Sequence, residues 1–218
     1  MRAWTFAAVL SPLLAGAAGA HPHIFIDTSI EVVLDEADRA VAVRIGWSYD
    51  ELFSLMVIGD HGLDPDGDGL LLPEEVAALS GFDMEWQEGY PGDSFALLGD
   101  ADLVLGPPED WDARFEEGRI LTTHLRRLPA PVEIGAGTFF VQVYDPGYYT
   151  AYVIVGDPVL TGGSGRCLAE AWGPDVDAAD EALKAALAEY SADQDLEADF
   201  PAIGRNYAEE VRVTCAAP

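Results

Sequence analysis

Residues 64–75 carry the spacing of a calcium-binding loop. Ca²⁺ takes about six to eight oxygen ligands, and in a twelve-residue EF-hand loop these come from alternating early positions, a backbone carbonyl and a final bidentate glutamate. The expected ligands are Asp64, Asp66, Asp68, Leu70 and Glu75. Helical patterns flank the loop, so we predict a lone EF-hand with a structural Ca²⁺. A solvated acidic turn is the alternative.

A second candidate site lies near the N-terminus. Residues 1–20 combine an early arginine, an apolar stretch and a small-x-small end, which is typical of a secretory signal peptide cleaved after Ala20. Cleavage would leave His21 at the N-terminus, where its amine and imidazole can chelate one metal ion. Alternate residues of an extended segment share a face, so His21, His23 and Asp27 would point the same way. Such donors suit Zn²⁺, Cu²⁺ or Ni²⁺; a frayed end with two idle histidines is the alternative.

Two further residues are candidate ligands for this transition-metal site. His124 lies in a strand-like run and could complete the site, although a structural histidine is the default interpretation. Asp145 lies in the segment 144–149, Tyr-Asp-Pro-Gly-Tyr-Tyr, which predicts a turn between two strands. The tyrosines and the aspartate could line a pocket, but a rigid hairpin with aromatic packing is slightly favoured.

The elements that must position these residues follow from hydrophobic periodicity. Alternating apolar residues and Gly/Pro turns predict strands within 23–48, 94–160 and 210–215. Helical spacing appears within 49–80, on both sides of the acidic loop, and again over 175–190. The predicted fold class is therefore α+β: a mainly antiparallel β domain with an inserted helix–EF-hand loop–helix segment and one late amphipathic helix.

Composition limits the function classes. The chain has 218 residues, which suits a signal peptide followed by a single domain over 21–218, and its formal net charge is −28. That charge repels phosphate backbones and anionic lipids, so a nucleic-acid partner is not expected. Beyond the signal peptide no apolar run reaches the roughly 18–20 residues of a membrane span. Serine hydrolase, zinc protease, P-loop and dinucleotide motifs are missing from the sequence, so we expect no enzyme.

The sequence has two cysteines, Cys167 and Cys215. In an oxidising compartment they are expected to form a disulfide. Two buried free thiols are the alternative.

The order of these features resembles the periplasmic domain-of-unknown-function 1007 family. The resemblance rests on the signal peptide, His-Pro-His-Ile-Phe-Ile-Asp at 21–27, Trp47, the lone EF-hand and the 144–149 turn, and it extends over roughly 21–170. It implies a periplasmic component of a transport system, with ZevA-like members supplying zinc to a NicO/RcnA-type inner-membrane permease. The family's opening motif matches His21, His23 and Asp27, its later motif matches Tyr144, Asp145, Pro146, Tyr148 and Tyr149, and the two cysteines fit its late cysteines. A long His-rich stretch is missing from the sequence, which favours one site over high-capacity storage.

These observations favour a periplasmic metal-binding protein that delivers zinc, or nickel or cobalt, to a permease. Two alternatives remain open. One is a Ca²⁺-stabilised periplasmic adaptor that binds a protein partner and no transition metal. The other is a copper enzyme with an N-terminal histidine brace, in which His124 would supply the ligand from across the fold.

Overall fold

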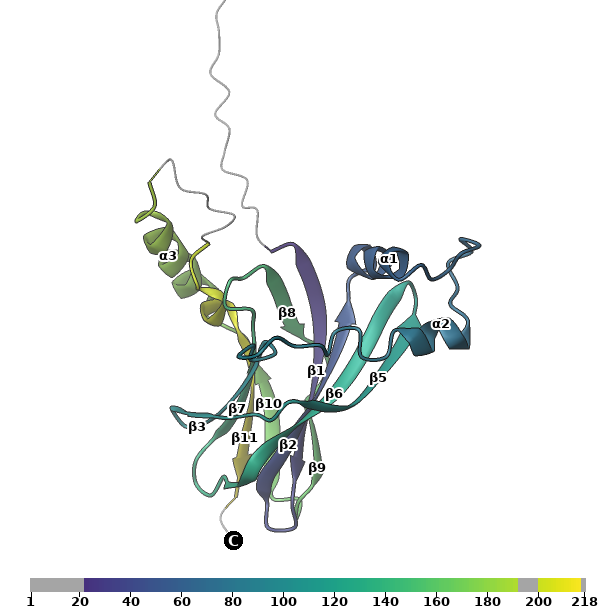
Figure 1. Cartoon of the computed structure of the whole chain (residues 1–218). Helices are drawn as coiled ribbons and strands as arrows, with labels where there is room; N and C mark the ends of the chain where they lie inside the picture. Colours follow the sequence, from purple (N-terminus) through teal and green to yellow (C-terminus); the bar gives the residue numbers. More distant parts are fainter. Residues whose placement is uncertain (1–21, 192–199, 217–218) are drawn as a thin grey trace, which may run out of the picture.

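The computed structural model describes residues 22–191 and 200–216, so the predicted signal peptide and His21 lie outside the described residues. The described strands form two sheets (Figure 1). The first sheet has the order β5 (Pro108–Glu116), β6 (Arg119–Glu133), β2 (Arg39–Tyr49), β1 (Ile24–Leu34) and β8 (Thr150–Ile154), and β9 (Val159–Gly162) also pairs with β1. The second has the order β10 (Cys167–Trp172), β11 (Glu209–Cys215), β7 (Phe139–Val143), β3 (Ser94–Leu98) and β4 (Ala101–Leu103).

Strands β1 and β2 form the predicted antiparallel pair, with a register that runs from Ile26 opposite Tyr49 to Leu34 opposite Ala40. The turn between them is held by Asp35, whose carboxylate accepts hydrogen bonds from the backbone N–H groups of Ala37 and Arg39. An aspartate that bonds the backbone a few residues further on is a common way to close a turn. Local sequence therefore fixes this hairpin.

The two sheets pack face to face around one hydrophobic core. Alternate residues of each strand point inward, as the period of two requires. The fully buried apolar side chains include Val32, Val43, Ile45 and Ile120 from the first sheet and Phe139, Val141, Val211 and Val213 from the second. Burial of each such side chain contributes roughly 1.5–3 kcal/mol to stability.

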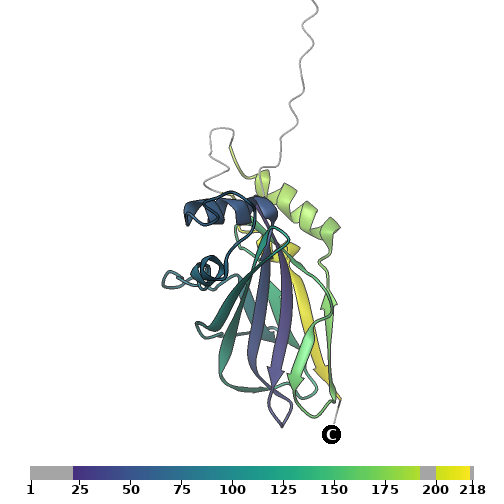
Figure 2. The same ribbon diagram turned by 90° about the vertical axis from the view of Figure 1, so that its right-hand side faces the viewer.

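The helices gather at one end of the sheets, whereas the β1–β2 turn and the C-terminus lie at the other (Figure 2). They are α1 (Glu51–Asp60), α2 (Pro73–Ala78), α3 (Val176–Leu187) and the 3₁₀ turn η1 (Gly204–Tyr207). Asp50 is the N-cap of α1: one carboxylate oxygen accepts from Phe53 N–H at 2.8 Å and the other from Phe25 N–H at 2.9 Å. This residue therefore ties α1 to the start of β1. Within the described ranges, no helix is both long enough and apolar enough to cross a membrane.

The predicted fold class needs correction, because the protein is mostly β and the inserted helix–EF-hand loop–helix segment is not present as such. Helix α2 has only six residues and none of them is buried, so it forms no packed partner for α1. Glu75, at the last loop position, accepts from the backbone N–H of Leu72 at the start of α2 and from that of Asp64 at the start of the loop. The strand pairing is mainly antiparallel, as predicted, although β1 pairs in parallel with both β8 and β9. An EF-hand is defined by the packing of its two helices, and the loop pattern in the sequence does not determine that packing.

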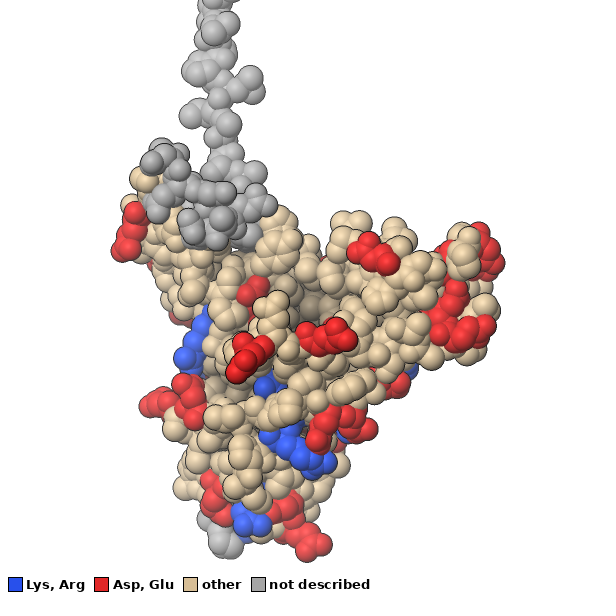
Figure 3. Space-filling view, viewed as in Figure 1, with Lys and Arg blue, Asp and Glu red and all other residues tan. Residues whose placement is uncertain are grey.

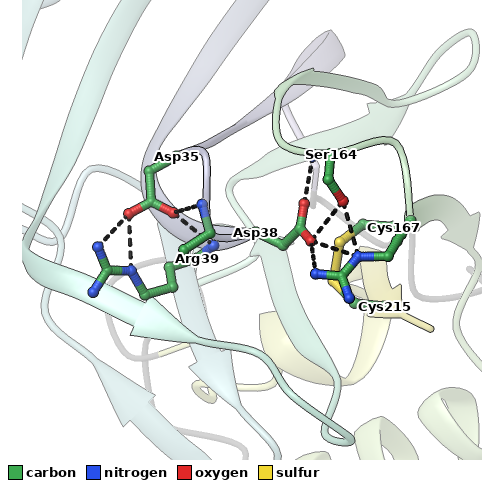
Figure 4. The surroundings of a disulfide bond; sticks show 8 residues. Asp35, Asp38, Arg39, Ser164, Cys167 and Cys215 are labelled. Atoms are coloured by element: carbon green, nitrogen blue, oxygen red, sulfur yellow. Dashed lines mark hydrogen bonds and ion pairs between the residues drawn. A yellow bond between two sulfur atoms is a disulfide. The ribbon is translucent and has the colours of Figure 1, made fainter. Parts of the chain in front are cut away.

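The predicted disulfide is confirmed between Cys167 and Cys215, which lie directly opposite each other on β10 and β11 (Figure 4). Beside it, the buried carboxylate of Asp38 accepts hydrogen bonds from Ser164 and forms an ion pair with Arg166. Hydrogen bonds from the backbone N–H and hydroxyl of Ser164, together with Arg166, lower the pKa of Asp38. These contacts join the β1–β2 turn to the segment that enters β10.

Candidate functional site

The acidic loop between α1 and α2 brings together three of its five predicted ligands. Carboxylate oxygens of Asp64, Asp66 and Asp68 all lie within 4.8 Å of one another. Asp64 organises the loop, because its two oxygens accept from the backbone N–H groups of Asp68 at 3.0 Å and Gly69 at 3.1 Å. Acidic side chains gather where this loop projects from the molecule (Figure 3). The negative charge of Asp68 is the main cause of the raised pKa of Asp66.

The other two predicted calcium ligands, Glu75 and Leu70, form hydrogen bonds within the loop and at the start of α2. Glu75 accepts from Asp64 N–H at 3.1 Å through one oxygen and from Leu72 N–H at 2.7 Å through the other. Leu70 is exposed, and its N–H donates to Asp68. The arrangement is thus a cluster of three carboxylates that faces water. Hard oxygen donors of this kind suit Ca²⁺, whose coordination water molecules can complete.

The predicted transition-metal residues are not assembled in the described part of the chain. His23 is exposed at the start of β1; its N–H donates to the Tyr149 carbonyl at 2.8 Å, and the two rings lie 4.6 Å apart. Asp27 forms an ion pair with Arg119 at 2.7 Å. His21 falls outside the described residues.

Asp145 has a structural role in its turn. One carboxylate oxygen accepts from Gly147 N–H, and the other accepts from Tyr149 and Thr150 N–H. The segment is not the expected hairpin, because β7 before it belongs to one sheet and β8 after it to the other. It crosses between the sheets, and Tyr144, Asp145 and Tyr148 line a pocket of about 410 Å³ beside α3.

His124 is fully buried in the core and lies far from solvent. Its ring packs edge-on against Trp47 at 4.7 Å and Trp86 at 5.6 Å between centroids, and neither ring nitrogen has a hydrogen-bond partner in the protein. Burial, and then the positive charge of Arg126, lowers its pKa to about 3, so the imidazole is neutral at pH 7. Among the described residues, the rings that pack against it are those of two tryptophans.

Around His124 the structure contains a polar network that the sequence analysis missed. Asp83 accepts hydrogen bonds from Tyr49 and Thr122, both of which lie on the inner face of the first sheet. Asp93 accepts from Tyr152, and burial raises its pKa to about 6. One feature of the sequence could have indicated this network. In β6 the residues Thr122, His124 and Arg126 occupy successive inward positions, which are usually apolar.

An apolar groove runs between α1 and the start of β1, with a volume of about 400 Å³. It is lined by His23, Ile24, Asp50, Leu52, Phe53, Leu55, Met56 and Tyr149. His23, one of the predicted transition-metal ligands, thus lies at the edge of this groove.

The fold and the site together define an acidic, disulfide-bonded protein of two packed β-sheets with a candidate cation loop at its helical end. The chain belongs to the DUF1007 family, described as a protein of unknown function, whose family model matches residues 6–215. The predicted family is thus confirmed, and the match is longer than the 21–170 expected from the sequence motifs. A comparison with curated proteins gives no match.

Proposed function

We propose that this protein is an exported divalent-cation-binding protein whose 64–68 loop holds Ca²⁺. The observation that carries the proposal is the group of Asp64, Asp66 and Asp68 carboxylates within 4.8 Å. Three like charges so close together repel, as the raised pKa of Asp66 indicates, and a divalent cation between them relieves that repulsion. The protein binds and does not catalyse.

The bound ion would have a structural effect of modest size. At a concentration of about ten times its Kd, an ion that binds only the folded state adds about 1.4 kcal/mol to stability. The loop joins α1 to α2, and α2 buries none of its own residues. Ca²⁺ would therefore act as a clip on the connection between α1 and α2.

A second part of the proposal concerns transition metals. His21 and His23, with the amine created by cleavage after Ala20, would bind Zn²⁺, or Ni²⁺ or Co²⁺, in the periplasm and pass it to an inner-membrane permease. The support is the His-Pro-His sequence and the implied role of ZevA-like family members. Asp27 forms an ion pair with Arg119 and Asp145 accepts hydrogen bonds within its own turn, so the proposed site uses the two imidazoles and the N-terminal amine as donors. The buried position of His124 argues against a copper histidine brace that uses it.

The calcium site is tested by thermal unfolding of the exported protein with EDTA and with Ca²⁺. We expect Ca²⁺ to raise Tm by about 2–6 °C, since a kcal/mol corresponds to roughly 2–4 °C in a protein of this size. Asp66→Asn should abolish the shift, whereas the exposed control Asp157→Asn should retain it. An equal shift in both variants would place the calcium elsewhere.

The transition-metal site is tested separately by native mass spectrometry and calorimetry with Zn²⁺. We expect an N-terminus at His21 and one tightly bound Zn²⁺, lost in His21→Ala/His23→Ala but retained in Asp66→Asn. Binding of Ca²⁺ without any micromolar Zn²⁺ binding would overturn the carrier role and favour the Ca²⁺-stabilised adaptor.

A further inference from the structure

Helix α1 is apolar on two opposite faces. Its inner face buries Val57 and Ile58 against the end of the sheets. Its outer face presents Leu52, Leu55 and Met56, which are 77%, 66% and 54% exposed. A helix that is apolar all round is normally buried on all sides, so the outer face of α1 lacks a covering element in the described structure.

The outer face forms one wall of the apolar groove. Ile24 at the start of β1 and the half-exposed Tyr149 ring form the other wall. Figures 1 and 2 both place α1 at the helical end of the molecule, above the ends of β1 and β2. The spacing of Leu52, Leu55 and Met56, at i, i+3 and i+4, puts the three side chains on a single stripe.

Hydrogen bonds tie α1, which forms one wall of the groove, to both β1 and β6. Asp50 caps α1 and also binds Phe25 N–H, as described above. From the inner side, the buried Ser54 hydroxyl accepts from Ile120 N–H at 2.9 Å, which joins α1 to β6. A preformed groove reduces the ordering cost of binding.

The charges around the groove select its occupant. Asp50 lies in the groove, Glu51 and Asp60 lie at the two ends of α1 and are exposed, and no lysine or arginine is among the lining residues. With a net charge of −28 on the chain, a second copy would be repelled, and so would an anionic bilayer. A partner that carries basic residues around an apolar stripe satisfies both the shape and the charge.

We propose that this groove binds an amphipathic helix of a partner protein, with apolar residues at i, i+3, i+4 and i+7 and with flanking lysine or arginine. This is the helix-in-groove mode of peptide recognition, in which the apolar stripe gives affinity and the acidic rim gives orientation. The inference rests on the proposed function only in requiring a protein partner. Peptide binding by the groove needs no bound metal, so the groove can fail to bind a helix while cation binding stands. Equally, cation binding can fail while the groove binds a helix.

The test uses the exported protein and a labelled 18-residue Leu/Lys peptide with leucines in that helical pattern. Fluorescence anisotropy near 150 mM salt measures binding to the wild type and to Leu52→Gln/Leu55→Gln/Met56→Gln. The matched control is Val104→Gln/Leu168→Gln, two similarly exposed apolar residues away from the groove. We expect micromolar binding to the wild type and the control, and at least tenfold weaker binding to the triple variant. A peptide of the same composition with scrambled leucines should also bind at least tenfold weaker.

Several results would overturn the inference. Failure of the patterned peptide to bind, or equal binding to the triple variant, would remove the groove as a helix site. A dimer in light scattering that the triple variant loses would assign the face to a second copy. Binding to phosphatidylcholine vesicles that the triple variant loses would assign it to a membrane. If the triple variant unfolds, the single changes Leu52→Gln and Leu55→Gln replace it, with an expected several-fold loss each.

Discussion

Replacing His124 by phenylalanine should stabilise the protein, and more strongly at acidic pH. The side chain is fully buried between Trp47 and Trp86, and both ring nitrogens lack hydrogen-bond partners. A buried polar group without a partner costs roughly 1–3 kcal/mol, whereas an apolar ring of similar shape avoids that cost. Phenylalanine should therefore increase the free energy of unfolding at pH 7.5 by about that amount.

The pH dependence gives the sharper part of this prediction. The pKa of His124 is lowered from 6.5 to about 3 in the folded protein. Between these two values the unfolded chain binds a proton that the folded protein does not, so the stability of the wild type falls as pH falls below 6.5. From pH 7.5 to pH 5 this loss is about 2 kcal/mol, and His124→Phe removes it. The advantage of the variant over the wild type should thus grow by about 2 kcal/mol over that range.

Urea unfolding at pH 7.5, 6 and 5, followed by tryptophan fluorescence, measures the difference between the two proteins at each pH. Ile45→Val is the matched control, because Ile45 is also fully buried, lies opposite His124 in the β2–β6 register and does not titrate. Its effect should be the same at all three values. A difference between wild type and His124→Phe that does not change with pH would refute the reasoning, since it would mean that His124 has the same pKa in the folded and the unfolded protein.

Three other changes have expected outcomes. Cys167→Ala/Cys215→Ala should lower the free energy of unfolding by up to about 4 kcal/mol, because the disulfide closes a separation of 48 residues; a Tm loss of only one or two degrees would contradict this. Asp93→Asn should stabilise the protein by up to about 3 kcal/mol above pH 6 and not below pH 4. The pKa of Asp93 is raised from 3.8 to about 6 in the folded protein, so the wild type loses stability as pH rises through this range. Equal effects of the substitution on thermal unfolding at pH 3.5 and pH 7 would contradict this. Ser54→Ala should lower the free energy of unfolding in urea by about 1–3 kcal/mol, because the buried N–H of Ile120 loses its acceptor. Ser54→Thr keeps a hydroxyl and should lower it less; an equal loss in both variants would contradict the role of the hydroxyl.

The candidate cation loop could be found from sequence because its chemistry is local. Asp64, Asp66 and Asp68 are separated by single residues, so any tight turn brings their carboxylates together. Glu75 lies eleven residues after Asp64, and its two carboxylate oxygens accept from the backbone N–H groups of Asp64 and Leu72. The length and burial of α2 depend on neighbours outside the loop, so the larger EF-hand unit could not be inferred from the pattern.

The predicted transition-metal ligands are distant in sequence, and the sequence does not show which of them the fold brings together. His124 was predicted to lie in a strand and was kept as a possible ligand beside the default of a structural histidine, but the face of β6 on which it lies is decided by pairing with β2. Asp145 was proposed from a turn whose flanking strands belong to different sheets, which no local signal reveals. Arg119 binds Asp27 across a separation of 92 residues.

By itself, the sequence determined the family, the first two strands and their turn, the late amphipathic helix, the pairing of the two cysteines and the acidic loop, because each depends on periodicity, turn chemistry or a short motif. Only the tertiary structure decided how the strands divide between two sheets and that a buried polar network surrounds His124. It also decided that α1 leaves an apolar face open. The physical reason is that these features arise from packing between segments far apart in the chain, where burial and pairing override what each segment prefers alone.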